Sequence, residues 1–531
     1  MFDLLIRNGW IIDGTGTAAF RGDVGLSDGK ITAVGRELSG GAAKVIDAGR
    51  KVVTPGFIDI HRHADYAVFR PGFGRLELKQ GLTTIINGNC GLSAAPIAGP
   101  WQREIQDYLR PITGPAKEGV PTDSLRAYLA AAESVALPIH VGMLAGAGTI
   151  RAAAAGYNKE QIDDSEYDAI HQMLRRSIEE GAFGVSLGLG YAPECFYTTD
   201  QLVRALEPLK GSGLPITVHM REEGDQVLKA LEEMLEVGRR LETPVHISHL
   251  KAMGRRNWDL LIPQALERME KARAEGQDVS CDVYPYTAGS TQLIHILPHD
   301  FLTGGTEAVT ERLRDPRQRA ILTERIKTGR DFDNIAGMVG WENILCSTLN
   351  QPENRPYEGM SIAAIAEAQG KDPFTCAYDL LVSEHCAITM IDFITADSDI
   401  GRILRDDHAG VISDSTYPTE GKLHPRVCGT FARIIEKFVE QDRGLTLEQA
   451  VRKMTSVPAA ALRLRGKGTI APEMDGDLCI FDPKAIHERG DYRDPFQYAE
   501  GMEYVLVDGV PAIEEGEFAA MDRGRVLRRP V

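Results

Sequence analysis

Short apolar runs alternate with stretches of helical periodicity along most of the chain. In residues 225–241, for example, apolar side chains recur at spacings of three and four, which predicts an amphipathic helix. Strands that alternate with helices form βα units and a parallel sheet. The eight predicted strands are Phe57–Ile60, Thr83–Asn87, Ile139–Leu144, Phe183–Leu187, Ile216–His219, Val245–His249, Val279–Val283 and Gly410–Ser413.

Eight such units predict an α/β fold, a (β/α)8 TIM-like barrel, over residues 55–290 and 408–467. The two chain ends have another pattern, with short strands separated by turn signals such as Asp13-Gly14 and Ser27-Asp28-Gly29. We expect residues 1–54 and 468–531 to build one small β-sandwich domain together.

Residues 291–407 are far too long for one βα connection. We expect an inserted, mainly helical subdomain there, with helices near residues 306–330 and 361–384. Insertions at a barrel mouth often act as lids, but a plain stabilising insertion fits the pattern equally well.

Composition narrows the class of protein. The 531 residues are 43% hydrophobic and 25% charged, which is typical of a globular protein, and the net charge is −17. That charge argues against nucleic-acid partners, which need basic surface. The chain has no basic, apolar leader and no run near 20 apolar residues, and its eight cysteines form no CxxC pair. These features predict a cytoplasmic protein without a membrane partner.

Candidate metal ligands follow the predicted strands. His61 and His63 end the first strand, and residues i and i+2 of a strand share a face. An isolated His-x-His is more often a solvated strand end, so the other strand ends decide. Those ends carry Cys90, His219, His249 and Asp414 in chain order. Imidazole and thiolate are zinc ligands, and a nearby carboxylate is the usual proton acceptor for metal-bound water.

The motifs around these residues point to a family. They include "PGFIDIHRHADY", "INGNCGLSAAP", "TVHMREEGD", "ISHLKAMG", "DVYPYTAGST", "ISDS" and "HPRVCGTFARII". The sequence resembles the amidohydrolase superfamily and, within it, the N-acyl-D-amino-acid deacylase (D-aminoacylase) family. The fourth strand has no bridging lysine or glutamate, and this family instead uses a cysteine after the second strand, here Cys90.

The resemblance implies roles for individual residues. Zinc would be held tightly by Cys90, His219 and His249, with His61 and His63 at a second, weaker site. Asp414 would be the general base. Three residues would hold the substrate carboxylate: Lys251, Tyr284 and Arg426. From the residues alone, Lys251 could instead be a solvated loop charge, Tyr284 a core aromatic and Arg426 part of a structural ion pair.

The implied activity is hydrolysis of the linear amide of an N-acyl-D-amino acid, and D specificity rests on resemblance alone. Alternatives are a cyclic-amide hydrolase of the hydantoinase or dihydroorotase kind, a D-dipeptidase and an inactive scaffold relative. The expected partner is a small-molecule substrate, and a homo-oligomer is left open. Arg62 and Ala147 depart from the family pattern, which we expect to bear on the pocket. Asp65 and Glu222 are candidates for supporting contacts, whereas His246 faces away from His249.

Overall fold

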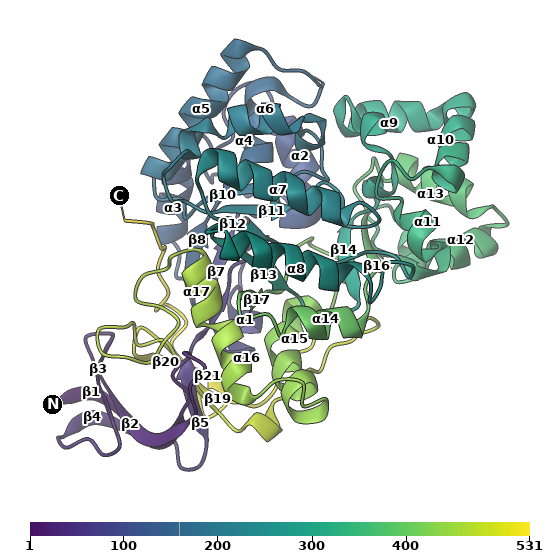
Figure 1. Cartoon of the computed structure of the whole chain (residues 1–531). Coiled ribbons are helices and arrows are strands. Elements are labelled where there is room, and N and C mark those ends of the chain that lie inside the picture. Colours follow the sequence, from purple (N-terminus) through teal and green to yellow (C-terminus); the bar gives the residue numbers. More distant parts are fainter. Residues whose placement is uncertain (159, 531) are drawn as a thin grey trace.

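A computed structural model describes residues 1–158 and 160–530 of the chain, and a parallel barrel forms its centre (Figure 1). One run of strands is ordered β6-β7-β8 and another β9-β10-β11-β12-β13-β17. The runs meet where Phe183 N donates to Met143 O (3.0 Å) and where Arg62 bridges to Ser415. The strands are β6 (Phe57–Asp59), β7 (Leu82–Asn87), β8 (His140–Met143), β9 (Ala145–Gly146), β10 (Val185–Gly188), β11 (Ile216–His219), β12 (Val245–Ile247), β13 (Val279–Val283) and β17 (Ala409–Val411).

The predicted (β/α)8 barrel is therefore confirmed, and β11 and β13 have the predicted bounds. Most barrel-strand residues are buried, because the barrel interior covers one face and helices cover the other. The helices around the barrel are α1 (Arg75–Lys79), α2 (Gln102–Thr113), α3 (Leu125–Glu133), α4 (Ala147–Ala155), α5 (Asp164–Glu179), α6 (Thr199–Ala205), α7 (Val227–Leu241), α8 (Leu261–Ala274), α14 (Asp397–Ile403), α15 (Arg426–Arg433), α16 (Leu447–Met454) and α17 (Ser456–Ala461).

Both chain ends contribute to one further sheet, with strand order β21-β20-β19-β18-β5-β1-β2-β3 and β4 beside β1. Ile480 pairs with Val53, which joins the C-terminal strands to the N-terminal ones. β1 runs through both halves of its segment as one strand, with an irregularity in its pairing with β2 between Ile6 and Gly9. The bounds are β1 (Phe2–Ile11), β2 (Phe20–Ser27), β3 (Lys30–Gly35), β4 (Ala42–Asp47), β5 (Val52–Pro55), β18 (Leu478–Phe481), β19 (Met502–Val507), β20 (Val510–Glu514) and β21 (Glu517–Phe518).

The segment between β13 and β17 projects to one side of the barrel (Figure 1). It carries an antiparallel sheet in the order β14-β16-β15 and a group of helices. Each predicted helix is in fact two: Pro316 opens a new helix capped by Asp315, and left-handed Gly370 ends the first helix of the second pair. The bounds are β14 (Ala288–Gln292), β15 (Ile344–Thr348), β16 (Thr389–Phe393), α9 (Gly305–Arg314), α10 (Pro316–Thr328), α11 (Ile335–Val339), α12 (Ile362–Gln369) and α13 (Pro373–Ser383).

Among the described helices, none combines the length and the apolar composition needed to cross a membrane.

Candidate metal centre and active site

The predicted ligands gather at the carboxyl ends of the barrel strands. His219 is the last residue of β11, and His249 lies two residues beyond β12. Cys90 follows β7 by three residues, as Asp414 follows β17. This is the rim at which barrel enzymes place their chemistry.

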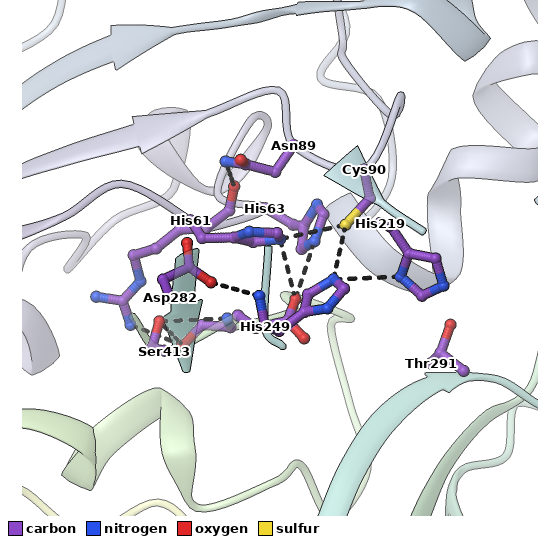
Figure 2. A network of polar contacts seen from close by, with 12 residues as sticks. His61, His63, Asn89, Cys90, His219, His249, Asp282, Thr291 and Ser413 are labelled. Carbon is purple, nitrogen blue, oxygen red and sulfur yellow. Dashed lines mark hydrogen bonds and ion pairs between the residues drawn. The ribbon is translucent and has the colours of Figure 1, made fainter. Parts of the chain in front are cut away.

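Two other donor atoms lie close to His249 Nε2 (Figure 2). Its Nε2 lies 3.5 Å from Cys90 Sγ and 3.2 Å from His219 Nδ1. Tetrahedral zinc with ordinary bond lengths has N–N edges of about 3.4 Å and N–S edges of about 3.6 Å. Each distance, measured to His249, matches one such edge, so His249 with either Cys90 or His219 fits two corners of a zinc tetrahedron.

The other predicted ligands lie on the far side of Cys90. His61 Nε2 is 3.2 Å from Cys90 Sγ and 3.4 Å from Asp414 Oδ1, and His63 Nε2 is 3.3 Å from the same carboxylate oxygen. The donor atoms therefore form two overlapping groups, one of His61, Cys90, His249 and Asp414 and another of His219, Glu223 and His249. Cys90 and His219 each contact His249 but belong to different groups, so the predicted tight triad is not one compact cluster.

The charge states of His219, His249 and Asp414 suit metal binding. Burial, the largest cause, holds the pKa of His219 and of His249 well below the usual range, so both rings are neutral and keep a lone pair for a metal. Burial alone would raise the pKa of Asp414. The Arg426 guanidinium and the His61 and His63 rings instead hold it well below its usual range. Asp414 is therefore a carboxylate at neutral pH.

Three of these residues adopt left-handed backbone angles that favour glycine. The φ angle is +53° at Cys90, +38° at His249 and +53° at Asp414. Such conformations cost on the order of 1–3 kcal/mol each and gather at functional sites. Buried hydrogen bonds hold two of these turns in place. Asn89 Nδ2 donates to the carbonyls of Ile60 and Ile86 (3.2 and 3.0 Å), and the Asp282 carboxylate accepts from His249 N.

The predicted carboxylate clamp lies beside this centre. Lys251 Nζ is 2.8 Å from His249 Nδ1 and donates to Glu223 Oε2 at 2.7 Å. The Arg426 guanidinium lies 4.9 Å from the Tyr284 ring centre, and its Nη1 is 3.1 Å from Asp414 Oδ2. Arg426 Nη2 donates to Ser290 O at 3.0 Å, and Nε is a buried donor without a hydrogen-bond partner among the described residues.

With this geometry in place, comparison with known proteins identifies the family. Residues 334–513 match the model described as "Amidohydrolase family". The chain is 32% identical to the D-aminoacylase of Alcaligenes xylosoxydans xylosoxydans, over 99% of this chain and 98% of the relative. The chain belongs to the N-acyl-D-amino-acid deacylase family of amidohydrolases. It is a metal-dependent amide hydrolase.

Two further relatives share this family's fold or sequence over nearly the full length. The N-acyl-D-glutamate deacylase of the same Alcaligenes is 32% identical, over 99% of this chain and 96% of the relative. A solved N-acyl-D-glutamate deacylase from Bordetella bronchiseptica is 30% identical, with a TM-score of 0.83 over 99% of both chains. That structure holds zinc and a phosphonate inhibitor that mimics the tetrahedral intermediate.

A cavity beside the predicted metal ligands opens between the barrel rim and the inserted segment. Its wall contains His219, His249, Asp414, Lys251 and Tyr284 from the predicted set. The other described residues that line it are Gly190, Tyr191, Arg221, Glu223, Met253, Gly289, Ser290, Thr291, His295, Leu297, His299, Phe332, Asp333, Ile335, Asp392 and Ile394.

Several predicted residues do not line this cavity, among them the ligand candidates Cys90, His61 and His63. Arg426 is fully buried behind the wall, against Asp414 and Tyr284. Arg62 and Ala147 do not line the cavity either, so the expectation that they shape it directly is not met. Arg62 donates to Ser415 Oγ (3.0 Å) and lies 3.5 Å from Glu77, away from the ligands.

The candidates for supporting contacts also lie outside the ligand groups. Asp65 Oδ1 accepts from Ala94 N (3.0 Å), and burial raises the pKa of Asp65 to about 7. Glu222 lies beside Asp333, and burial and then Glu222 raise the pKa of Asp333 well above its usual range. His246 pairs with Asp282 (2.7 Å), as its position on the opposite strand face predicts.

Two functional candidates were not identified from the sequence. Glu223 lies 3.1 Å from His249 Nδ1, so its carboxylate can orient that ring, and its place beside Glu222 in the β11–α7 loop gave no signal of this contact. Asp392 lines the cavity from β16 in the inserted segment. Burial raises the pKa of Asp392 to about 6, against the opposing effect of Lys251 and Arg426. No motif in its sequence neighbourhood marked it.

Proposed function

We propose that this enzyme is a zinc-dependent hydrolase of N-acyl-D-amino acids, which releases a carboxylic acid and a free D-amino acid. The observation that carries the proposal is the meeting of two imidazoles, the Asp414 carboxylate, Lys251 and Tyr284 at one cavity, with Cys90 in contact with His249. The D configuration and the acyl substrate follow the names of relatives aligned over 99% of the chain.

In this proposal Cys90, His219 and His249 hold the tight zinc, and His61 and His63 offer a second, weaker site. Thiolate and neutral imidazole are the donors that zinc prefers. When bound, zinc polarises a carbonyl and lowers the pKa of a water molecule toward 7. Glu223 would orient the His249 ring through Nδ1, at the 3.1 Å distance found here.

Asp414 moves the proton in this proposal. Its Oδ1 faces the Nε2 atoms of His61 and His63, and its ionised state allows it to accept a proton from the attacking water. The same carboxyl then donates that proton to the amide nitrogen, which must leave as a neutral amine. Arg426 holds the other oxygen, Oδ2, and so fixes the orientation of the carboxylate.

Lys251, Tyr284 and Arg426 would bind the α-carboxylate of the substrate. Arg426 supplies a buried positive charge behind Tyr284, and Lys251 supplies a point charge at the cavity wall. Arg426 lies behind the cavity wall, against Tyr284 and Asp414. We therefore expect its positive charge to act on the substrate carboxylate from behind these two side chains. A fixed carboxylate would set the scissile amide over the ligand group, which is where orientation contributes to rate.

The clamp is tested with Arg426→Met on matched acid and methyl-ester substrates. Loss of one member of a buried charge pair costs about 2–5 kcal/mol. We therefore expect kcat/KM for the free acid to fall by roughly two to three orders of magnitude, since about 1.4 kcal/mol is tenfold. The wild type should strongly prefer the acid to the ester, and the variant should show a much smaller preference.

The matched control is Arg433→Met on the same helix. Arg433 pairs with Glu488 at 2.7 Å and should leave the acid-to-ester ratio unchanged. Equal hydrolysis of acid and ester by the wild type would argue against the clamp.

D and L pairs of N-acyl substrates and a hydantoin, assayed with metal content on the same sample, separate the deacylase from the cyclic-amide alternative. The cytoplasmic location and the oligomeric state stay predictions.

A further inference from the structure

Asp392 is a buried carboxylate on the cavity wall that the proposed mechanism does not use. Its side chain is 2% exposed, and its Oδ1 accepts no hydrogen bond from the described residues. A buried carboxylate oxygen without a donor is costly, so its retention calls for an explanation. A ligand that supplies a donor is the simplest one.

The other charged groups of the cavity already have partners. Lys251 pairs with Glu223 at 2.7 Å, and Arg221 forms a two-pronged contact with Glu233 at 2.9 and 3.0 Å. Both carboxylate oxygens of Asp333, in turn, accept from backbone N–H groups of the β11–α7 loop. Asp392 is therefore a carboxylate of this wall that has no ion-pair partner among the described residues.

Gly289 places backbone instead of a side chain next to that oxygen. Gly289 of β14 pairs directly with Asp392 of β16. A Cβ atom placed on Gly289 would lie 3.1 Å from Asp392 Oδ1, 3.1 Å from Tyr284 Oη and 2.8 Å from Ile394 Cδ1. The glycine thus keeps open a point at which the carboxylate, the clamp tyrosine and an apolar side chain meet.

This point lies next to the clamp proposed for the α-carboxylate. In a bound N-acyl amino acid, the side chain is attached to the same α-carbon as the carboxylate, so it lies next to the clamp. An acidic side chain there would face Asp392, and Arg221, the other cation of the wall, is occupied by Glu233. An aliphatic stem can pack on Met253 and Ile394, which also line the cavity.

We propose that Asp392 selects N-acyl-D-amino acids whose side chain ends in a cationic hydrogen-bond donor, an amine or a guanidinium. This inference rests on the proposed deacylase function and adds the substrate class. It sets the enzyme apart from relatives named for D-glutamate, because a carboxylate repels an acidic side chain and leaves it without a partner.

The experiment compares side chains that differ only by an amine. N-acetyl-D-lysine is paired with N-acetyl-D-norleucine, and N-acetyl-D-ornithine with N-acetyl-D-norvaline, with N-acetyl-D-glutamate as the acidic arm. The wild type should favour the amine in at least one pair by about ten- to one-hundredfold in kcat/KM, as a charge-assisted hydrogen bond provides. In Asp392→Asn that ratio should fall about tenfold or more, and the glutamate derivative should improve relative to norleucine.

The matched control is Asp397→Asn, which removes one carboxylate on the solvent side, where Asp397 pairs with Lys437. It should keep the wild-type ratios. Metal content and melting temperature of each variant show whether it is folded, and the wild-type ratios test the inference without any variant. If the wild type favours the apolar member of both pairs, or if Asp392→Asn keeps the amine preference, Asp392 is not the selector although the deacylase function stands. If no N-acyl-D-amino acid is hydrolysed, both proposals fall.

Discussion

Cys90→Ala is expected to lose most of its bound zinc and nearly all turnover. Cys90 Sγ lies 3.5 Å from His249 Nε2 and 3.2 Å from His61 Nε2, so the sulfur contacts two imidazoles of its donor group. An alanine leaves the tight site with two imidazoles, which is an incomplete tetrahedron. Zinc per chain, measured after dialysis against a weak chelator and compared with kcat on the same sample, tests the assignment.

His219→Ala should behave like Cys90→Ala, whereas His61→Ala should keep substantial zinc because His61 belongs to the weaker site. Cys376→Ala is the matched control: Cys376 is a buried thiol in α13 of the inserted segment, far from the ligands in sequence and fold. It should retain its zinc. Full zinc retention in Cys90→Ala would remove Cys90 from the ligand set.

The barrel could be predicted from the sequence because its strands are short apolar runs that end in turn residues. β11 and β13 have the predicted bounds for this reason. The convergence of the candidate ligands could be predicted as well, since parallel strands bring their carboxyl ends to one rim. Two helix breaks were also readable: Asp315-Pro316 is an N-cap followed by a proline that opens a helix, and Gly370 is a typical helix end.

Other features depend on contacts between segments that are distant in the sequence. Asp392 acquires its environment from Gly289, Lys251 and Arg426, more than 30 residues away, and a lone aspartate in an apolar strand carries no such information. Glu223 stands beside Glu222 in a charged loop, and only the folded chain distinguishes the one that meets His249. The domain boundaries near residues 54, 290, 407 and 467 stay predictions.

The roles of the individual site residues also stay predictions, and Asp414 carries the most chemistry among them. Its position three residues beyond β17, with φ at +53°, turns the carboxylate toward His61 and His63. Arg426 stabilises the ionised form from the other side at 3.1 Å. A group held ionised in this way accepts a proton only when the attacking water is itself made acidic, which is the contribution that a bound metal supplies.

Asp414→Asn is therefore expected to fold and to retain its zinc, but to lose kcat by about two to four orders of magnitude. The amide has nearly the shape of the carboxylate, yet it can neither accept the proton of the water nor return one to the leaving nitrogen. Asp406→Asn is the matched control, because Asp406 precedes the amino end of the same strand and pairs with Arg273 at 2.8 Å. The measurement is single-turnover and steady-state hydrolysis of one N-acetyl-D-amino acid, with metal content determined in parallel. An Asp414→Asn enzyme that keeps more than about a tenth of the wild-type kcat would show that another group handles the proton, since a positioned acid or base contributes at least about a hundredfold.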